Sequence, residues 1–165
     1  MKLIDIYRAR YDGRTKEALA AASLRLEQLA HERSDSWMEM WTSLMCLKGD
    51  CYLDLGDYLN AEACFNEVYN RTRNPIALGN RAYARESLKR LEEAKADYIM
   101  ALTLPSDNET KEVQSRNLAS LCIRMNDLND ASKYLQQARN LVGDSFEVID
   151  FQRELDRARR KMVHE

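Results

Sequence analysis

A motif built around one alanine recurs three times in this chain of 165 residues. In each copy a short polar turn leads to an apolar residue, the alanine follows three positions later, and a bulky residue stands four positions after the alanine. The three alanines are Ala61, Ala94 and Ala131. Spacings of three and four place these side chains on one face of a helix, and a small residue in that face lets a neighbouring helix approach closely.

A second small residue precedes each of these alanines by twelve positions. These upstream residues are Gly49, Ala82 and Ala119, and each lies in its own amphipathic segment. Each unit is therefore expected to be two helices that touch at small residues and are joined by a tight turn. The motif alanines are 33 and 37 residues apart, and a recurrence in this range indicates stacked helix–turn–helix repeats.

A weaker copy of the motif opens the chain. Its turn is Asp12–Gly13 and its alanine is Ala18, which lies 43 residues before Ala61. Only residues 3–11 are available for its first helix, so we expect a truncated first unit whose second helix runs to about residues 30–32.

Several short runs resemble the tetratricopeptide repeat (TPR). They are Gly49-x-x-Tyr52, Ala61-x-x-x-Phe65, Pro75, Asn80-Arg81-Ala82 and Glu92-Glu93-Ala94. The resemblance extends over about residues 1–142 and is strongest for 42–142. It implies an all-α fold, a helical-hairpin solenoid or TPR-like superhelix of about three to four repeats. We expect a single domain over residues 1–165, divided into an atypical first repeat (1–33), three repeats (36–73, 74–105 and 107–142) and a capping helix (145–164).

The capping helix is predicted from a single apolar stripe near the C-terminus, formed by Val148, Phe151, Leu155, Ala158 and Met162. Charged residues cover the rest of this segment. Stacked repeats leave an apolar face open at the end of the stack, and a helix with a polar outer side covers such a face.

Polar residues also predict where helices begin. Ser36-x-x-Glu39 and Ser106-x-x-Glu109 have the spacing of capping boxes. Asn74-Pro75 is an N-cap residue followed by proline at the first helical position. Asp127 and Asp144 are predicted to cap the last two helices.

Charge and hydropathy argue against nucleic acid and membranes as partners. The 25 basic and 27 acidic residues give a net charge of −2, whereas a phosphate-binding surface usually has a basic excess. No run approaches the roughly 20 apolar residues of a membrane span. Charges interrupt the apolar residues at the start of the chain, unlike in a secretory signal, so we expect a cytoplasmic protein.

No motif for catalysis, a cofactor or a metal is found. The four cysteines include no CxxC pair, and neither histidine lies near a cysteine in the sequence. Walker, GxGxxG and GxSxG runs are also missing. We therefore expect no enzyme activity, no cofactor and no metal site, and we expect reduced cysteines that pack as small apolar side chains.

The resemblance implies that the first helices of the repeats line a concave groove, which in this family binds a peptide or a helix of a partner protein. It places the following partner-binding residues in the groove: Leu47, Asp50, Asp54, Asn80, Tyr83, Glu86, Arg116, Asn117, Ser120 and Arg124. The acidic members lie toward one end and the two arginines toward the other, so a divided groove that orients a bipolar ligand is a further expectation.

Asn80 and Asn117 hold equivalent positions in successive units, each two residues before the small residue of its helix. An amide offers donors and an acceptor, and can bind a peptide backbone without selecting a sequence. Some TPR domains hold the C-terminal carboxylate of chaperones with lysine, arginine and asparagine. Of the corresponding residues here, only Asn80 fits that clamp, and Asp50 would repel a carboxylate.

The leading functional hypothesis is a non-catalytic adaptor that binds a partner protein in this groove. Two alternatives stay open, a small bacterial secretion-type chaperone and an immunity or inhibitor protein that occludes its partner. A homodimer through the N-terminal region is a further possibility, because Ile6, Trp37, Met38 and Trp41 are apolar residues that a truncated first unit must cover. Burial under the second helix is the favoured explanation for them.

Overall fold

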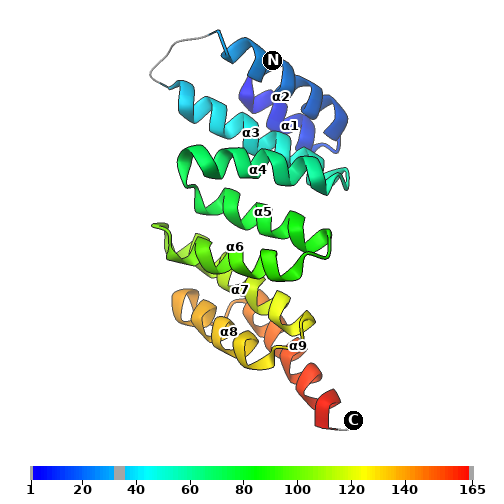
Figure 1. Ribbon diagram of the computed structural model, residues 1–165, viewed down its shortest axis with the longest axis vertical. Helices are drawn as coiled ribbons and strands as arrows, with labels where there is room; N and C mark the ends of the chain where they lie inside the picture. The colour runs from blue at the N-terminus through cyan, green and yellow to red at the C-terminus, as the bar shows by residue number, and fades with distance from the viewer. Residues whose placement is uncertain (1, 32–35, 164–165) are drawn as a thin grey trace.

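A computed structural model describes residues 2–31 and 36–163, and within these ranges it contains nine α-helices and no β-strand (Figure 1). The helices are α1 (Leu3–Tyr11), α2 (Thr15–Leu29), α3 (Trp37–Asp54), α4 (Tyr58–Thr72), α5 (Pro75–Ser87), α6 (Leu91–Thr103), α7 (Asn108–Arg124), α8 (Leu128–Val142) and α9 (Phe146–Val163). The prediction of an all-α helical-hairpin solenoid is confirmed. In the described residues, no helix is both long enough and apolar enough to cross a membrane.

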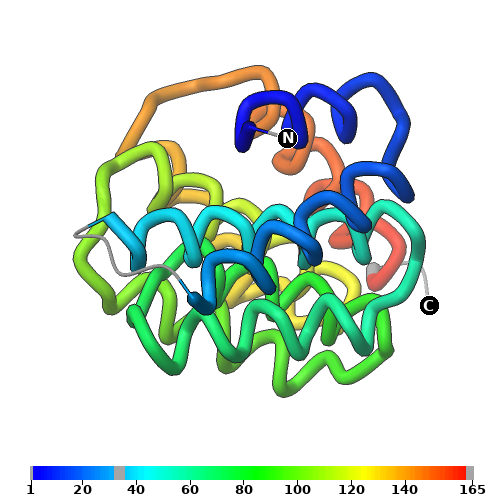
Figure 2. Tube along the Cα trace, turned by 90° about the horizontal axis from the view of Figure 1, so that it is seen from above, coloured from blue at the N-terminus to red at the C-terminus, as the bar shows by residue number. Residues whose placement is uncertain are grey.

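Eight of these helices pair as four antiparallel hairpins that stack along one axis, and α9 follows at the C-terminal end (Figure 1). Each hairpin packs on the next through its second helix, in the pairs α2–α3, α4–α5 and α6–α7. The first helices also touch one another, since α1 contacts α3 and α5 contacts α7. No two of the second helices are in comparable contact within the described residues. The first helices therefore lie on the more crowded inner side, and the stack curves when viewed from its end (Figure 2).

The four hairpin turns share one backbone conformation. Each contains a residue with positive φ at an equivalent position: Gly13, Gly56, Lys89 and Asn126. In each turn the next residue donates its N–H to the carbonyl five positions back, as in Asp57 to Tyr52 at 2.8 Å and Asp127 to Cys122 at 2.8 Å. The positive-φ residue lies five positions before the motif alanine in every hairpin. The sequence repeat is thus also a repeat of turn geometry.

The small residues of the motif lie where helices come closest. Ala61, Ala94 and Ala131 are fully buried, and so is Ala18 in the first hairpin. Gly49 shows how tight the contact is, since a Cβ added there would lie 2.7 Å from the ring of Phe65 on the partner helix. Any side chain at position 49 must therefore displace that ring.

Helix α5 joins two regions of the core. Ala77 and Ala84 pack in a cluster with residues of α1 to α4, whereas Ala82 packs in a cluster that continues through α6 to α9. Alanines on different faces of one helix let it contact both neighbours closely. The core is therefore continuous through α5, which carries part of the groove described below.

A buried ionic network crosses α4, α5 and α6. The carboxylate of Asp97 accepts hydrogen bonds from Arg81 at 2.7 and 2.8 Å, and one from Arg85 at 2.8 Å. Arg85 also donates to Glu62 at 2.8 Å. Because Asp97 and Arg81 are both buried, their charges are stabilised mainly by one another.

The predicted caps are partly right. Asn74 accepts N–H bonds from Ile76 and Ala77 at the start of α5, and Asp127 caps α8, as expected. Ser36 makes no side-chain cap bond, Asp107 caps α7 in place of Ser106, and Ser145 caps α9 in place of Asp144. The last two errors are one-residue shifts, which arise because adjacent residues could each serve as a cap.

Helix α9 contacts α7 and α8 at the end of the stack. Val148 and Leu155 are fully buried, and Phe151 and Ala158 pack against the same cluster. Met162, at the end of the predicted stripe, is 52% exposed. The helix therefore covers the last hairpin with its first four turns, and the predicted end at residue 164 lies outside the described residues.

Candidate peptide-binding groove

Two adjoining cavities open along the first helices between α5 and α9. The first, called the amide cavity below, has a volume of about 360 Å³ and is lined by Ile76, Asn80, Asp107, Glu109, Thr110, Val113, Gln114 and Asn117. The second, called the tyrosine cavity, has a volume of about 290 Å³ and is lined by Tyr83, Glu86, Tyr98, Asn117, Ser120, Arg124 and Phe151. Asn117 lines both, so the two cavities form one groove.

Six of the eight residues that line the amide cavity have hydrogen-bonding side chains. Asn80 reaches it from α5, Gln114 and Asn117 from α7, and Asp107 and Glu109 from the start of α7. The carboxylate of Asp107 accepts the N–H of Thr110 at 2.7 Å. This backbone hydrogen bond lowers the pKa of Asp107, so the group is ionised at neutral pH.

The tyrosine cavity combines an ion pair with aromatic rings. Glu86 on α5 and Arg124 on α7 form a salt bridge that links the two first helices. Tyr98 is 1% exposed, and burial raises its pKa, with a smaller effect from the Glu86 carboxylate. Tyr83 is 47% exposed, so its ring offers a surface against which an apolar side chain can pack.

The N-terminal part of the predicted groove is occupied by contacts within the chain. Arg10 on α1 donates to Asp54 at 2.7 and 3.0 Å and to Asp50 at 3.4 Å. The Asn80 amide also donates to Asp50, at 3.4 Å. A chain of polar contacts therefore connects α1, α3 and α5 along the inner side.

Burial raises the pKa of Asp50. Desolvation raises the pKa of this carboxyl from 3.8 to about 6, with Arg10 acting in the opposite direction and Asp54 adding a smaller increase. The folded state therefore keeps this proton to a higher pH than the unfolded state. The contribution of Asp50 to stability is then present below about pH 4 and lost as the pH rises through about 6.

Replacing Asp50 with asparagine should remove this dependence. At pH 7 we expect Asp50→Asn to be more stable than the wild type by roughly 1–3 kcal/mol, with the difference vanishing near pH 4, because asparagine resembles the protonated carboxyl. Arg10 keeps its bonds to Asp54 in this variant. Urea unfolding across this pH range measures the difference, with Asp150→Asn on the exposed face of α9 as the control. A carbon NMR titration that gives Asp50 an ordinary pKa would contradict the expectation.

The structure changes two expectations about the groove. Leu47 is fully buried in the N-terminal core cluster, so the prediction that it contacts a partner is wrong. The predicted division into acidic and basic ends is also wrong, because the charges pair with one another. Asp50 and Asp54 pair with Arg10, Glu86 with Arg124, and Arg116 with Glu112 at 3.1 Å.

Of the predicted site residues, the structure brings Asn80, Tyr83, Glu86, Asn117, Ser120 and Arg124 to the two cavities. Asp50 touches Asn80 from the side, Asp54 lies farther along α3, and Arg116 is not a lining residue of either cavity. Arg10, Gln114 and Phe151 were not among the predicted site residues. Arg10 lies in the predicted first helix, but its partners Asp50 and Asp54 lie 40 and 44 residues away in the sequence, so no local pattern connected it with the groove.

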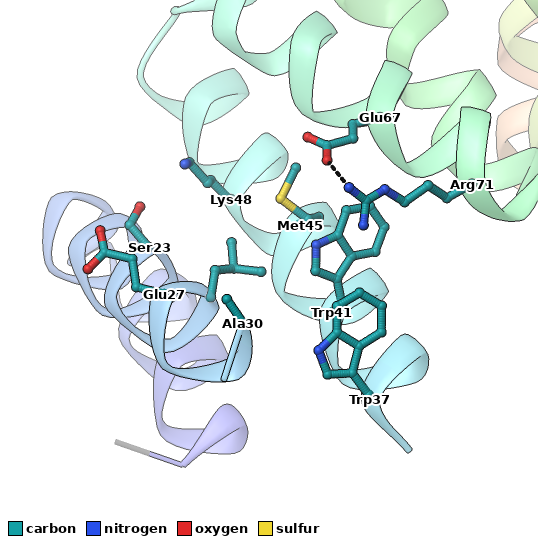
Figure 3. A pocket seen from close by; sticks show the side chains of 10 residues that line it. Ser23, Glu27, Ala30, Trp37, Trp41, Met45, Lys48, Glu67 and Arg71 are labelled. Atoms are coloured by element: carbon teal, nitrogen blue, oxygen red, sulfur yellow. Dashed lines mark hydrogen bonds and ion pairs between the residues drawn. The ribbon is translucent and has the colours of Figure 1, made fainter. Parts of the chain in front are cut away.

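A separate cavity of about 510 Å³ lies between α2, α3 and α4 (Figure 3). Trp37 and Trp41 are stacked in it with ring centroids 6.2 Å apart, and the guanidinium of Arg71 lies 4.3 Å above the Trp41 ring. Ile6 and Trp41 are buried, while Met38 is 43% exposed. Trp37 is partly buried, so the chain itself covers part of the apolar surface predicted to support a homodimer, and dimerisation remains a prediction.

One group of possible metal ligands occurs in the described residues. Atoms of Cys122, Asp127 and Asp130 lie within 4.8 Å of one another. The ammonium of Lys95, however, lies 2.8 Å from each carboxylate. Lys95 thus supplies the positive charge that a cation would supply, and the arrangement is accounted for as a salt bridge.

Comparisons with known proteins agree with this architecture. A family model described as tetratricopeptide repeat matches residues 42–75 and 76–108. The first TPR of Spaghetti (RPAP3), solved with the HSP90 peptide SRMEEVD, is 24% identical with a TM-score of 0.64, over 71% of this chain and 91% of that one. The first TPR domain of human RPAP3 is 22% identical with a TM-score of 0.67, over 75% and 96%.

A tetratricopeptide repeat protein from Parabacteroides merdae matches more of the chain. It is 17% identical with a TM-score of 0.74, and the match covers 96% of this chain and 59% of that one. A search of curated protein sequences finds no significant match. At these identities the solved structures establish the fold of this chain but not what its groove binds.

Proposed function

Because residues 42–108 carry two tetratricopeptide repeats within a TPR-like solenoid, we propose that this protein is a non-catalytic adaptor that binds a peptide or helix of a partner protein. The binding surface is the groove formed by the amide and tyrosine cavities. The observation that carries the proposal is that both cavities are lined mainly by the first helices α5 and α7 and share Asn117. A solved relative of the same fold holds a peptide of HSP90, which supports peptide binding as the kind of activity.

The state of the cysteines argues against one kind of catalysis, which is nucleophilic attack by a cysteine thiolate. Burial raises the pKa of Cys46 to about 12 and those of Cys51, Cys64 and Cys122 to about 11. All four are free thiols, and at neutral pH they carry the proton that a nucleophilic cysteine must lose. A cytoplasmic location, in which thiols stay reduced, is part of the proposal, as is the expectation that nucleic acid and membranes are not partners.

The proposal predicts that the two groove amides contribute to affinity. We expect the double variant Asn80→Ala/Asn117→Ala to bind the partner more than about tenfold more weakly, because each lost hydrogen bond contributes about 0.5–1.5 kcal/mol. The partner is first captured from native lysate with the wild-type protein and identified by mass spectrometry. Its affinity for both proteins is then measured by calorimetry.

A matched control separates the groove from the rest of the surface. Asn70→Ala/Asn129→Ala removes two exposed amides from the second helices α4 and α8, and it should leave the affinity unchanged. Thermal melting of both variants tests whether the fold is intact. Equal affinities for the two variants, with intact folds, would reject the groove and favour the inhibitor or immunity alternative. A secretion-type chaperone is instead expected to copurify with an apolar secreted protein that aggregates without it.

A further inference from the structure

The amide cavity has the chemistry of a site for a cation. Its lining includes the carboxylates of Asp107 and Glu109, the amides of Asn80 and Asn117, and no lysine or arginine. Both arginines of α7 are already paired, Arg116 with Glu112 and Arg124 with Glu86. The cavity therefore has acceptors and negative charge that no positive side chain of its own lining balances.

A buried acceptor in the same wall lacks a donor. Gln114 is 5% exposed, and its Oε1 atom has no hydrogen-bond partner within the part of the chain that the structure describes. Its amide lies against Gly79, where a Cβ would come within 2.2 Å of Oε1. The glycine thus leaves room for this amide beside the cavity. A buried amide oxygen without a donor costs free energy. Because this oxygen is closed to solvent, a ligand N–H recovers that cost only when the Gln114 amide turns toward the cavity.

The cavity also has an apolar side. Ile76 is 51% exposed and Val113 is partly buried, and both contribute to the lining. Lysine and arginine side chains combine an aliphatic stem with a charged head that only donates hydrogen bonds. Ile76 and Val113 fit the stem, while the amide oxygens and the two carboxylates fit the head.

We propose that the amide cavity binds a lysine or arginine side chain of the partner, and this proposal rests on the peptide-binding function above. The cationic head lies near the side-chain oxygens of Asn80 and Asn117, with Asp107 and Glu109 at the start of α7 supplying the charge and Gln114 in the wall beside them. Recognition of a basic side chain gives the groove a selectivity that backbone contacts alone do not provide.

Glu109 also has a structural role, and the experiment must distinguish that role from binding of a cation. It lies in the first turn of α7, where a carboxylate also stabilises the helix by interacting with its dipole. Glu92 lies in the first turn of α6 and does not line the cavity. Glu92→Gln therefore matches Glu109→Gln in its effect on a helix start and differs from it in position.

The test uses three capped amino acids as probes: N-acetyl-lysine N-methylamide, its norleucine analogue and its glutamate analogue. Each is titrated into the 165-residue chain while the side-chain amide signals of Gln114 and Asn117 are followed by proton–nitrogen NMR. We expect the lysine probe to shift these signals and to bind at least about fivefold more tightly than the norleucine probe. Glu109→Gln should weaken lysine binding about fivefold, and Glu92→Gln should not change it.

Several results would overturn the proposal. These are equal binding of the lysine and norleucine probes, preferential binding of the glutamate probe, no shift of these amide signals with any probe, or equal effects of Glu109→Gln and Glu92→Gln. The results of this test and of the partner-binding test of the adaptor function can be told apart. A partner that needs Asn80 and Asn117 while the lysine probe fails to bind would reject only the basic-residue site. A lysine probe that binds while the partner ignores the Asn80→Ala/Asn117→Ala variant would reject the adaptor groove, and only the affinity of the cavity for a basic side chain would stand.

Discussion

Replacing Asp97 with alanine is expected to lower the free energy of unfolding by about 3–5 kcal/mol. The change removes the carboxylate that Arg81 and Arg85 share and leaves their positive charges in a buried site without it. Asp97 accepts both hydrogen bonds from the Arg81 fork and a third from Arg85. The side chains of Asp97 and Arg81 are only 8% and 11% exposed. Water therefore cannot easily replace the lost carboxylate.

Urea unfolding followed by circular dichroism measures this effect. Asp150→Ala on α9 removes an exposed carboxylate and should change stability by less than about 0.5 kcal/mol. A loss of under about 1 kcal/mol for Asp97→Ala would mean that the contacts that remain, Asn66 with Arg81 and Glu62 with Arg85, are enough to hold the two guanidinium groups. The result bears on function because α5, which carries Arg81 and Arg85, also carries Asn80.

The contact between Gly49 and Phe65 gives the second large effect. Phe65 is fully buried, and Phe65→Ala should cost about 3–5 kcal/mol through lost burial and the cavity left behind. Gly49→Ala should cost about 1–3 kcal/mol, because the added Cβ would lie 2.7 Å from the Phe65 ring.

The double variant distinguishes this explanation from a general intolerance of change in α3. With Phe65 already replaced by alanine, the ring that blocks position 49 is gone. Gly49→Ala should then be neutral or stabilising by up to about 1 kcal/mol, because alanine favours a helix over glycine. A double-mutant cycle from chemical denaturation measures the difference. If Gly49→Ala costs the same in both backgrounds, the ring is not the reason for glycine at this position.

Local features of the sequence predicted the helical hairpins well. The small residues Gly49, Ala61, Ala94 and Ala131 were informative because close helix contacts leave space for little else. The turn residues added less, since lysine and asparagine take the positive-φ position in two of the four turns and only glycine is a strong signal for it. The structure therefore reveals a regularity in the turns that the residue types conceal.

The groove was predicted less completely, because its state depends on contacts between distant residues. Leu47 is buried by residues of other helices, which its own position in a first helix did not indicate. Arg10, which lies 40 and 44 residues away, pairs with Asp50 and Asp54 and offsets part of their charge. The charges along α3 alone therefore did not describe the electrostatics of the groove. Asn80 and Asn117 were placed correctly at the cavities because the repeat fixes their position relative to the small residues.

The nearest-neighbour packing of the hairpins also affects how the chain forms its structure during synthesis. Each hairpin closes with a short turn and needs only the adjoining hairpin to bury its apolar side. Contacts between residues close in sequence form quickly, since little chain entropy is lost in bringing them together. The α3–α4 hairpin can therefore assemble on a ribosome before α9 has been translated, and the final helix has only to close a stack that already exists.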